Sequence, residues 1–415
     1  MSEWNTTTLG DHVDLLTGFA FKSKEFTDKP GIRLARGDNV KRGYFDWGEG
    51  NAKYWPELTD ELRPYLLNAG DVLIGMDGSR VGQNWARVTE ADLPCLLVQR
   101  VARLRARPTL DPRFLRFLVG SPPFAAYVKA VHTGTSIPHI SGSQIKQFQI
   151  CLPPLREQQA IACILGALDD KIELNRRRCK TLEAMARAIF QSWFVDFDPV
   201  QAKAAGRTPA GLSPALAALF PDRFEDSPLG PIPAGWRVGT LGEVAEIRGG
   251  KQLPTEECLQ NARYVVFGAN GIMGYSTQST HNGFVIAFGR VGAYCGSVHW
   301  SLDGAWINNN ASSVRPFKWP AFVLQSMLEV DFTTMRTGSA QPFIPNSSLA
   351  AASIVLPEPK VADAYEVVAF PMRHKQASLR TESRTLAALR DALLPKLISG
   401  ELRVPDVERI VGRAT

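Results

Sequence analysis

The sequence predicts an α+β protein with an internal duplication, in which two mixed α/β domains are separated by two long helices forming an antiparallel coiled coil. Three observations favour this fold. The segment TGTSIPHISGSQIKQFQICLPP, from Thr133, returns 204 residues later as TGSAQPFIPNSSLAAASIVLPEP. A long stretch rich in helix-forming residues follows each copy. The chain of 415 residues is also too long for one hydrophobic core and suits two or more domains.

The two copies extend beyond this segment in both directions. Downstream, the same offset needs no gap as far as Phe194. Upstream, Trp4 matches Trp236. Residues 70–82, which end in GSRVG, also resemble residues 283–292, which end in GRVG. This match pairs Arg80 with Arg290. Each half therefore consists of a variable mixed domain followed by a helical segment.

Composition divides the chain further. Between the halves, frequent Pro, Gly and Ala predict a linker with one short helix, from Pro214 to Phe220. The expected segments are a first mixed domain at 1–152, a helical region at 153–198, the linker at 199–232, a second mixed domain at 233–356 and a second helical region at 357–405.

The first helical region has the spacing of a coiled coil. Its apolar positions alternate four and three residues apart, which is a heptad seam rather than a simple amphipathic face. A lone Asn on such a seam typically fixes the register or direction of pairing. The seam consists of Ile161, Leu165, Leu168, Ile172, Asn175, Cys179, Leu182, Ala186, Ile189 and Trp193.

The second helical region is less regular. One row is apolar, the other has polar residues at its centre, and Pro371 predicts a kink or restart near the beginning of the helix. A generic packed helix pair therefore remains an alternative to a coiled coil. The two rows are Tyr365, Met372, Leu379, Leu386 and Leu393, and Ala369, Gln376, Ser383, Arg390 and Leu397. A helix from Glu157 to Phe194 would span about 57 Å, more than the roughly 34 Å turn of duplex DNA.

Composition and motifs exclude several classes of protein. No apolar run is long enough to span a membrane, and the six cysteines are scattered, as in a cytoplasmic protein with reduced thiols and no zinc site. The net charge of +6 permits nucleic-acid binding without arguing for it. No catalytic motif is present, and Gly75–Gly82 lacks the Lys-Ser/Thr ending of a phosphate-binding loop.

One tetrapeptide supports an alternative. Ser121-Pro122-Pro123-Phe124 resembles the [DNS]-P-P-[YF] loop with which amino-methyltransferases hold a flipped base. That loop should follow a strand, whereas the preceding RFLRFLVG indicates a helix, so a break between two helices is favoured. A standalone amino-methyltransferase remains the alternative function. A coiled-coil scaffold without DNA contact is a third.

The helical regions resemble a known family. LPPLREQQAIACILGALDDKIELNRRRCKTLEAMARAIFQSWFVDFDPV is similar to the central conserved region of the specificity subunits of type I restriction–modification enzymes. SRTLAALRDALLPKLISGELRV resembles their distal conserved region. The resemblance implies two target recognition domains, each reading one half of a split site in double-stranded DNA. It also implies helices that set the spacing of the half-sites.

The same resemblance implies the partners. Two modification subunits would carry S-adenosylmethionine and methylate adenine, and restriction subunits would translocate and cut DNA with ATP and Mg²⁺. The chain itself would be a non-catalytic, cytoplasmic protein without a cofactor or a membrane segment. The seam residues would form the coiled-coil and partner interface. The run Arg176-Arg177-Arg178 indicates a solvated or partner-facing stripe.

The candidate DNA-binding residues lie in loops of the two mixed domains. Arginines between glycines or small residues are candidates because Arg paired with guanine is the commonest specific contact, although such arginines can also be simple surface charges. The T-G motifs suit phosphate contacts, or a turn that needs Gly at positive φ, and both interpretations remain open. The candidates are Arg36, Asn39, Lys41, Arg42, Arg80, Thr133, Gly134, Thr135, Ser136, Arg290, Thr337, Gly338 and Ser339.

Overall fold

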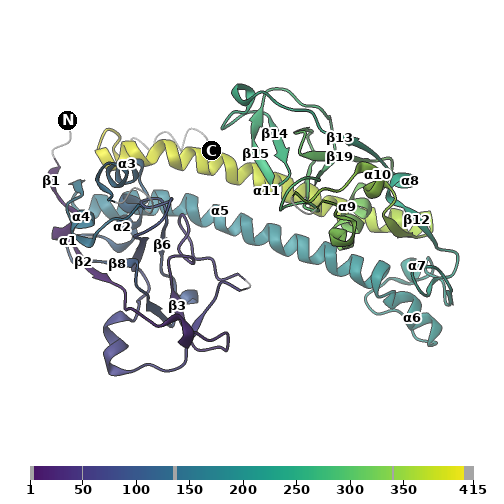
Figure 1. Ribbon diagram of the computed structural model, residues 1–415, viewed down its shortest axis with the longest axis horizontal. Helices are drawn as coiled ribbons and strands as arrows, with labels where there is room; N and C mark the ends of the chain where they lie inside the picture. The colour runs from purple at the N-terminus through teal and green to yellow at the C-terminus, as the bar shows by residue number, and fades with distance from the viewer. Residues whose placement is uncertain (1–3, 49, 134–137, 339–340, 406–415) are drawn as a thin grey trace. The chain divides into compact units, whose positions relative to one another are not determined.

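The structure is a computed structural model that describes residues 4–48, 50–133, 138–338 and 341–405 (Figure 1). The chain divides into two compact units, residues 1–173 with 384–415, and residues 174–383. Each unit contains one mixed domain and a portion of each long helix. Within the described ranges, no helix combines the length and apolarity that a membrane span requires.

The first unit is built on two sheets. An antiparallel sheet has the strand order β2-β8-β5-β6, and a mixed sheet has the order β4-β3-β7 with β3 parallel to β7. A third pair, β1 with β9, joins the start of the domain to its end. The strands are β1 (Asn5–Thr8), β2 (Val13–Thr17), β3 (Ile32–Ala35), β4 (Tyr54–Trp55), β5 (Val72–Gly75), β6 (Trp85–Arg87), β7 (Cys95–Leu97), β8 (Val101–Ala106) and β9 (Gln149–Leu152). The helices are α1 (Leu9–His12), α2 (Pro112–Val119), α3 (Pro122–Val131) and α4 (Gly142–Lys146).

Local sequence explains the central elements of this unit. Strand β5 is the apolar run VLIG, buried throughout, as expected for a strand covered on both faces. Helix α2 begins where the Asp111 side chain accepts hydrogen bonds from the backbone N–H groups of Arg113 (2.8 Å) and Phe114 (3.2 Å). Pro112 at the first helical position strengthens this start.

The second unit repeats this topology. Its sheets have the orders β13-β19-β16-β17 and β15-β14-β18, and β12 pairs with β20. The predicted α+β fold with an internal duplication is therefore confirmed. The strands are β12 (Arg237–Thr240), β13 (Ala245–Gly249), β14 (Tyr264–Gly268), β15 (Gly271–Ser276), β16 (Val285–Gly289), β17 (Val298–Ser301), β18 (Ala305–Ile307), β19 (Ala311–Pro316) and β20 (Ser353–Leu356). The helices are α8 (Leu241–Val244), α9 (Pro320–Glu329) and α10 (Asn346–Ala350).

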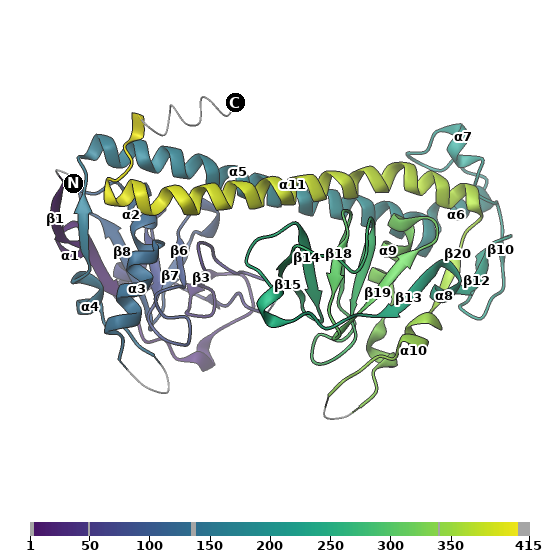
Figure 2. The ribbon, with the colours of Figure 1, turned by 90° about the horizontal axis from the view of Figure 1, so that it is seen from above.

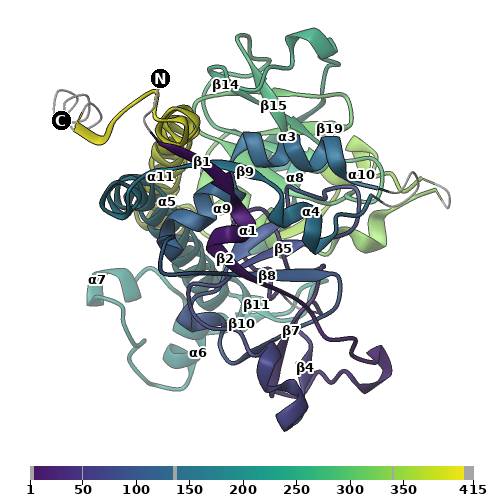
Figure 3. The same cartoon turned by 90° about the vertical axis from the view of Figure 1, so that its left-hand side faces the viewer.

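Two long helices, α5 (Leu155–Phe190) and α11 (Pro359–Ser399), run side by side (Figures 2 and 3). In the first unit, Arg390 of α11 pairs with Asp169 of α5 (2.8 Å). In the second unit, the Tyr365 hydroxyl donates to the Ala186 carbonyl (3.1 Å). Later residues of one helix thus meet earlier residues of the other, which makes the pair antiparallel, as predicted.

A π-helical turn, Gln191–Val195, continues α5. All seam positions are buried or half-buried, from Ile161 to Trp193 in α5 and this turn and from Tyr365 to Leu397 in α11. Two of the three polar residues of the second row, Gln376 and Arg390, bond across the pair, whereas the Ser383 hydroxyl donates to the Leu379 carbonyl of its own helix (2.8 Å). The Gln376 side chain donates to the Cys179 carbonyl (2.9 Å). These bonds explain how a coiled coil tolerates polar residues at its centre.

Of the kink or restart predicted at Pro371, the restart is wrong. Helix α11 runs through it for 41 residues. Proline leaves the carbonyl of residue i−4 without its helical donor. Here that residue is Val367, which is 76% exposed, so water can satisfy its carbonyl and the cost of the interruption is small.

The segment 199–232, where composition predicts a linker with one short helix, is folded onto the second unit. It contains α6 (Asp198–Ala204), α7 (Pro214–Ala217) and the hairpin of β10 (Phe224–Glu225) and β11 (Ile232–Pro233). Val200, Phe220 and Ile232 belong to the core of that unit. These few well-spaced apolar residues outweigh the effect of the surrounding Pro and Gly.

Candidate DNA interface

Three chain segments meet at one edge of the first domain, and we call this place the first junction. The segments are the loop Gly75–Gly82 after β5, the turn 98–101 between β7 and β8, and the turn formed by Thr133 and residues 138–140. The first contains the candidate Arg80 and the last contains Thr133, the first residue of the first T-G motif. The fold therefore brings together two groups of candidates that are about 50 residues apart in the sequence.

Backbone hydrogen bonds hold the first junction. The Gly78 N–H donates to the Pro138 carbonyl (3.0 Å), and the Ile140 N–H donates to the Met76 carbonyl (2.9 Å). The Met76 N–H donates in turn to the carbonyl of Arg100 (2.9 Å). These bonds use only main-chain atoms, so the same pattern can form with different side chains.

The second domain has an equivalent second junction. The Gly292 N–H donates to the Pro342 carbonyl (2.8 Å), and the Ile344 N–H donates to the Arg290 carbonyl (2.9 Å). The Arg290 N–H donates in turn to the Asn310 carbonyl (3.2 Å). This is the bonding pattern of the first junction, bond for bond. The corresponding segments are residues 289–296, 308–311, 337–338 and 341–344.

These bonds correct the pairing of Arg80 with Arg290. The loops Gly75–Gly82 and Gly289–Gly296 have the same length, so Arg290 occupies the place of Met76. The counterpart of Arg80 is Tyr294, which is 56% exposed. The sequence match aligned similar letters, whereas the hydrogen bonds define which residues occupy equivalent positions.

The two candidate arginines differ in how they are held. Arg80 is exposed, and its carbonyl accepts from the N–H groups of Gln83 (3.0 Å) and Asn84 (3.2 Å), which closes a tight turn. Arg290 is half-buried and donates from Nε (3.2 Å) and Nη2 (3.0 Å) to the Asn309 carbonyl. Its guanidinium also lies 5.6 Å from the centre of the Phe343 ring, within reach of a cation–π contact.

The second T-G motif is a tight turn. Gly338 has a φ of +83°, and a Cβ there would lie 2.8 Å from the Gln341 carbonyl oxygen. The Thr337 hydroxyl donates to the Phe343 carbonyl (3.0 Å). The turn interpretation therefore holds for this copy, while Thr337 and Thr133 are exposed where a phosphate contact would need them. The candidates Gly134, Thr135, Ser136 and Ser339 lie outside the described residues.

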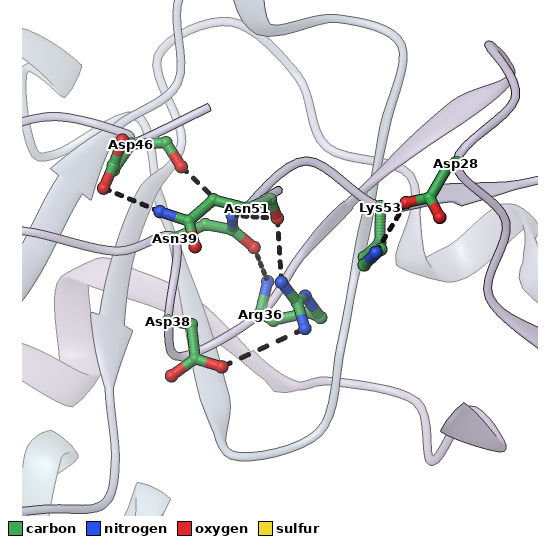
Figure 4. A network of polar contacts seen from close by, with 7 residues as sticks. All are labelled: Asp28, Arg36, Asp38, Asn39, Asp46, Asn51 and Lys53. Carbon is green, nitrogen blue, oxygen red and sulfur yellow. Dashed lines mark hydrogen bonds and ion pairs between the residues drawn. The ribbon is translucent and has the colours of Figure 1, made fainter. Parts of the chain in front are cut away.

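A second loop of the first domain, residues 36–51, is organised by Asn39 (Figure 4). Asn39 is fully buried; its Oδ1 accepts from the Arg36 N–H (3.2 Å), and its Nδ2 donates to the carbonyls of Asp46 (3.1 Å) and Asn51 (3.0 Å). Arg36 also donates from Nη2 to the Asn51 carbonyl (2.8 Å). Both candidates hold this loop in shape, and neither presents its side chain at the tip of the loop.

The tip of this loop exposes other residues. The Lys41 N–H donates to the Tyr44 carbonyl (3.0 Å), and Gly43, at a φ of +90°, closes the turn. Arg42 is exposed, Lys41 is half-buried and Tyr44 is 57% exposed. Sequence reasoning did not select Tyr44, although an aromatic residue next to an Arg-Gly turn is a recognisable signal for base stacking or groove contact.

The tetrapeptide Ser121-Pro122-Pro123-Phe124 begins helix α3, as predicted. The Ser121 hydroxyl accepts from the Phe124 N–H (3.3 Å) and caps the helix. Ser121 and Phe124 are both buried, so this motif does not line a pocket for a flipped base. Over the described part of the chain, no cluster of three or more His, Cys, Asp or Glu could hold a metal ion.

Known proteins are similar to this chain in sequence and in fold. The family model for the type I restriction modification DNA specificity domain matches residues 1–184. The type I restriction enzyme HindI specificity subunit of Haemophilus influenzae is 26% identical over 97% of this chain and 100% of its own. The MjaIX specificity subunit of Methanocaldococcus jannaschii is 24% identical over 71% of this chain and 70% of its own.

Among solved structures, the S subunit of a type I restriction–modification system from M. genitalium has the same fold. It superposes with a TM-score of 0.59 at 17% identity and covers 95% of this chain and 96% of its own. The duplicated domains, the paired long helices and the full-length relative agree with one another. The chain belongs to the specificity subunits of type I restriction–modification enzymes, the non-catalytic subunits that recognise DNA for these complexes.

Proposed function

We propose that this specificity subunit reads a bipartite, asymmetric site in double-stranded DNA, with one domain for each half-site. The observation that carries the proposal is the pair of junctions. They share their backbone hydrogen bonds, yet the outward side chains differ, as at Arg80 and its counterpart Tyr294. Two equal frameworks with different side chains suit two different half-sites.

The candidate contacts fall into two groups within this proposal. Arg42, Tyr44, Arg80 and Tyr294 are exposed on loops and are candidates for base contacts. Thr133 and Thr337 supply small hydroxyls at exposed turns, which suit phosphate contacts that position the protein without reading sequence.

The long helices would set the spacing of the half-sites and bind the partner subunits. At 36 residues, α5 is about 54 Å long. Large apolar side chains remain exposed on both helices, including Leu174 and Met185 of α5 and Val367 of α11. Such side chains suit contacts with two modification subunits and with restriction subunits in the cytoplasm. Those partners would supply S-adenosylmethionine, ATP and Mg²⁺.

The test is a domain replacement in cells that also express the modification subunit. Exchanging residues 1–152 for the first domain of another family member should change one half of the methylated motif and leave the other half intact, as read by methylation-sensitive sequencing. The purified chain without its partner should transfer no methyl groups. A change of both halves together, or methyl transfer by the isolated chain, would contradict the proposal.

A further inference from the structure

The first junction contains a cluster of three polar side chains that the sequence did not indicate. Asp77 accepts a short hydrogen bond from Nδ1 of His139 through Oδ1. Its second oxygen, Oδ2, lies 3.2 Å from Nε of Arg100. The three residues come from the three different segments of the junction, so the cluster exists only in the folded domain.

Arg100 has an unusual backbone conformation. It occupies the third position of the turn 98–101, which is closed by a bond from the Val101 N–H to the Val98 carbonyl (3.3 Å), and its φ is +67°. Turns of this kind favour Gly or Asn at that position because a Cβ is strained there. An arginine in such a place indicates that its side chain is needed.

The guanidinium of Arg100 is available for a ligand. The side chain is 70% exposed, whereas Asp77 is 21% exposed. The one described contact of the guanidinium is the ion pair between Nε and Asp77, so most of the group remains accessible to a ligand. A fork held in this way matches O6 and N7 of guanine, which accept hydrogen bonds side by side in the major groove.

The second junction shows that the cluster is not needed for folding. Val291 stands in the place of Asp77, Phe343 in the place of His139, and Asn310 in the place of Arg100. Neither of the two polar contacts can form there, yet the same backbone bonds close the junction. A charged cluster that the framework does not require is free to serve recognition.

We propose that Arg100 reads a guanine in the half-site of the first domain, with Asp77 and His139 as positioning residues that orient its guanidinium. This inference rests on the proposed function, because it assumes that the junction faces DNA. It adds a residue and a base to that function. The strain at Arg100 and the absence of the cluster from the second junction follow from the same cause, since the two domains read different bases.

The test uses the full chain in complex with its modification subunit. Duplexes that carry the methylated motif, or a single base substitution in it, compete for binding. Arg100→Asn introduces the residue that the second junction has at this place. Asn as a residue type tolerates positive φ, so the variant should fold at least as well as the parent. It should lose discrimination by about tenfold to a hundredfold at one G·C pair of the first half-site and at no other position.

Two further variants separate orientation from charge. Arg100→Lys keeps the charge without the fork, so affinity should persist in part while discrimination at that base pair is lost. Asp77→Asn should reduce discrimination at the same base pair without changing thermal stability. The matched control is Arg63→Asn, because Arg63 is 67% exposed and also has Nε bound by a carboxylate, that of Asp60 (2.7 Å), outside the junction. It should leave every preference unchanged.

Three results would overturn the inference. The preference at every base pair could survive Arg100→Asn, or the variant could weaken binding to all duplexes equally, which would indicate a phosphate contact. The control could also lose discrimination to the same extent. In each case the bipartite motif of the parent would remain, and the proposed function would stand. A parent complex without any base preference in the first half-site would instead refute the proposed function itself.

Discussion

Glu366 gives the second unit a pH-dependent attachment between its mixed domain and the long helix. From α11, its Oε1 accepts from the Phe322 N–H at the start of α9 (2.9 Å). One turn earlier, Asp363 accepts from Nε1 of Trp319 (2.6 Å) and pairs with Lys318 (2.9 Å). Trp319 offers no side-chain cap of its own, so Glu366 of α11 caps α9 instead, while Asp363 binds the side chains of Trp319 and Lys318 just before the helix.

Burial sets the sign of the pH dependence. It raises the pKa of Glu366 from 4.5 to about 7, while the hydrogen bond from Trp319 lowers the pKa of Asp363. Between pH 4.5 and 7 the folded protein therefore holds a proton on Glu366 that the unfolded chain has released. The free energy of unfolding should fall as pH rises through this window and level off above it.

The shift in the pKa of Glu366 also gives the size of the effect. At 1.36 kcal/mol for each pKa unit, it corresponds to at most about 3 kcal/mol. Because the carboxyl group is not completely buried, solvent screening reduces this to roughly 1–2 kcal/mol. Glu366→Gln keeps an oxygen acceptor for the Phe322 N–H without the ionisation. The variant should match the parent near pH 5 and exceed its stability by that amount above pH 7.

Hydrogen exchange of the α9 backbone and thermal unfolding, both followed from pH 5 to pH 9, measure this difference. The exchange measurement isolates the attachment from unfolding elsewhere in a chain with two units. Glu256→Gln is the control, because it removes the same charge from an exposed position of the same unit. Parallel pH profiles for Glu366→Gln and the parent would refute the assignment of the titration to Glu366.

Two further predictions concern the helices. Inserting four residues between Lys180 and Thr181 lengthens α5 by about 6 Å and turns it by roughly 40°, so the unspecified gap of the methylated motif should widen by about two base pairs. A heptad insertion should be tolerated better, and an unchanged gap in active variants would rule out spacing by the helices. Gln158, which is buried, bonds the N–H of Asp111 (2.8 Å) and two backbone carbonyls. Gln158→Ala should therefore destabilise the first unit by about 2–4 kcal/mol in denaturant unfolding, whereas substitution of the exposed Gln159 should not.

The long helices are the part of the fold that the sequence predicts best. A heptad seam depends only on local spacing, so the pattern from Ile161 to Trp193 identifies the buried face without knowledge of the partner helix. The behaviour of Pro371 depends on something that this pattern does not encode. Its cost is set by whether the freed carbonyl of Val367 meets water or protein, and that is decided by the packing of α11 on the domain.

The equivalence of the two junctions lies beyond the reach of residue matching. GSRVG and GRVG share most of their letters, so an alignment by identity places Arg80 opposite Arg290. The fold preserves something else, namely which N–H groups donate to which carbonyls, and these bonds place Arg290 opposite Met76. Side-chain identity is free to vary at such positions, and an alignment built on it is least reliable where function diverges.

For single candidate DNA-binding residues, too, the sequence does not decide which role a side chain has. Asn39 has a donor and an acceptor, which suit an adenine edge and equally suit the closing of a loop, and its burial shows that it closes the loop. The duplication separates these two uses. Where both copies keep the backbone bonds but exchange the side chain, as at Arg100 and Asn310, those bonds do not specify the residue, and of the two only Arg100 has a positive φ. Under the inference above, what selects an arginine in this strained turn is the surface that it contacts, and we propose that this surface is DNA.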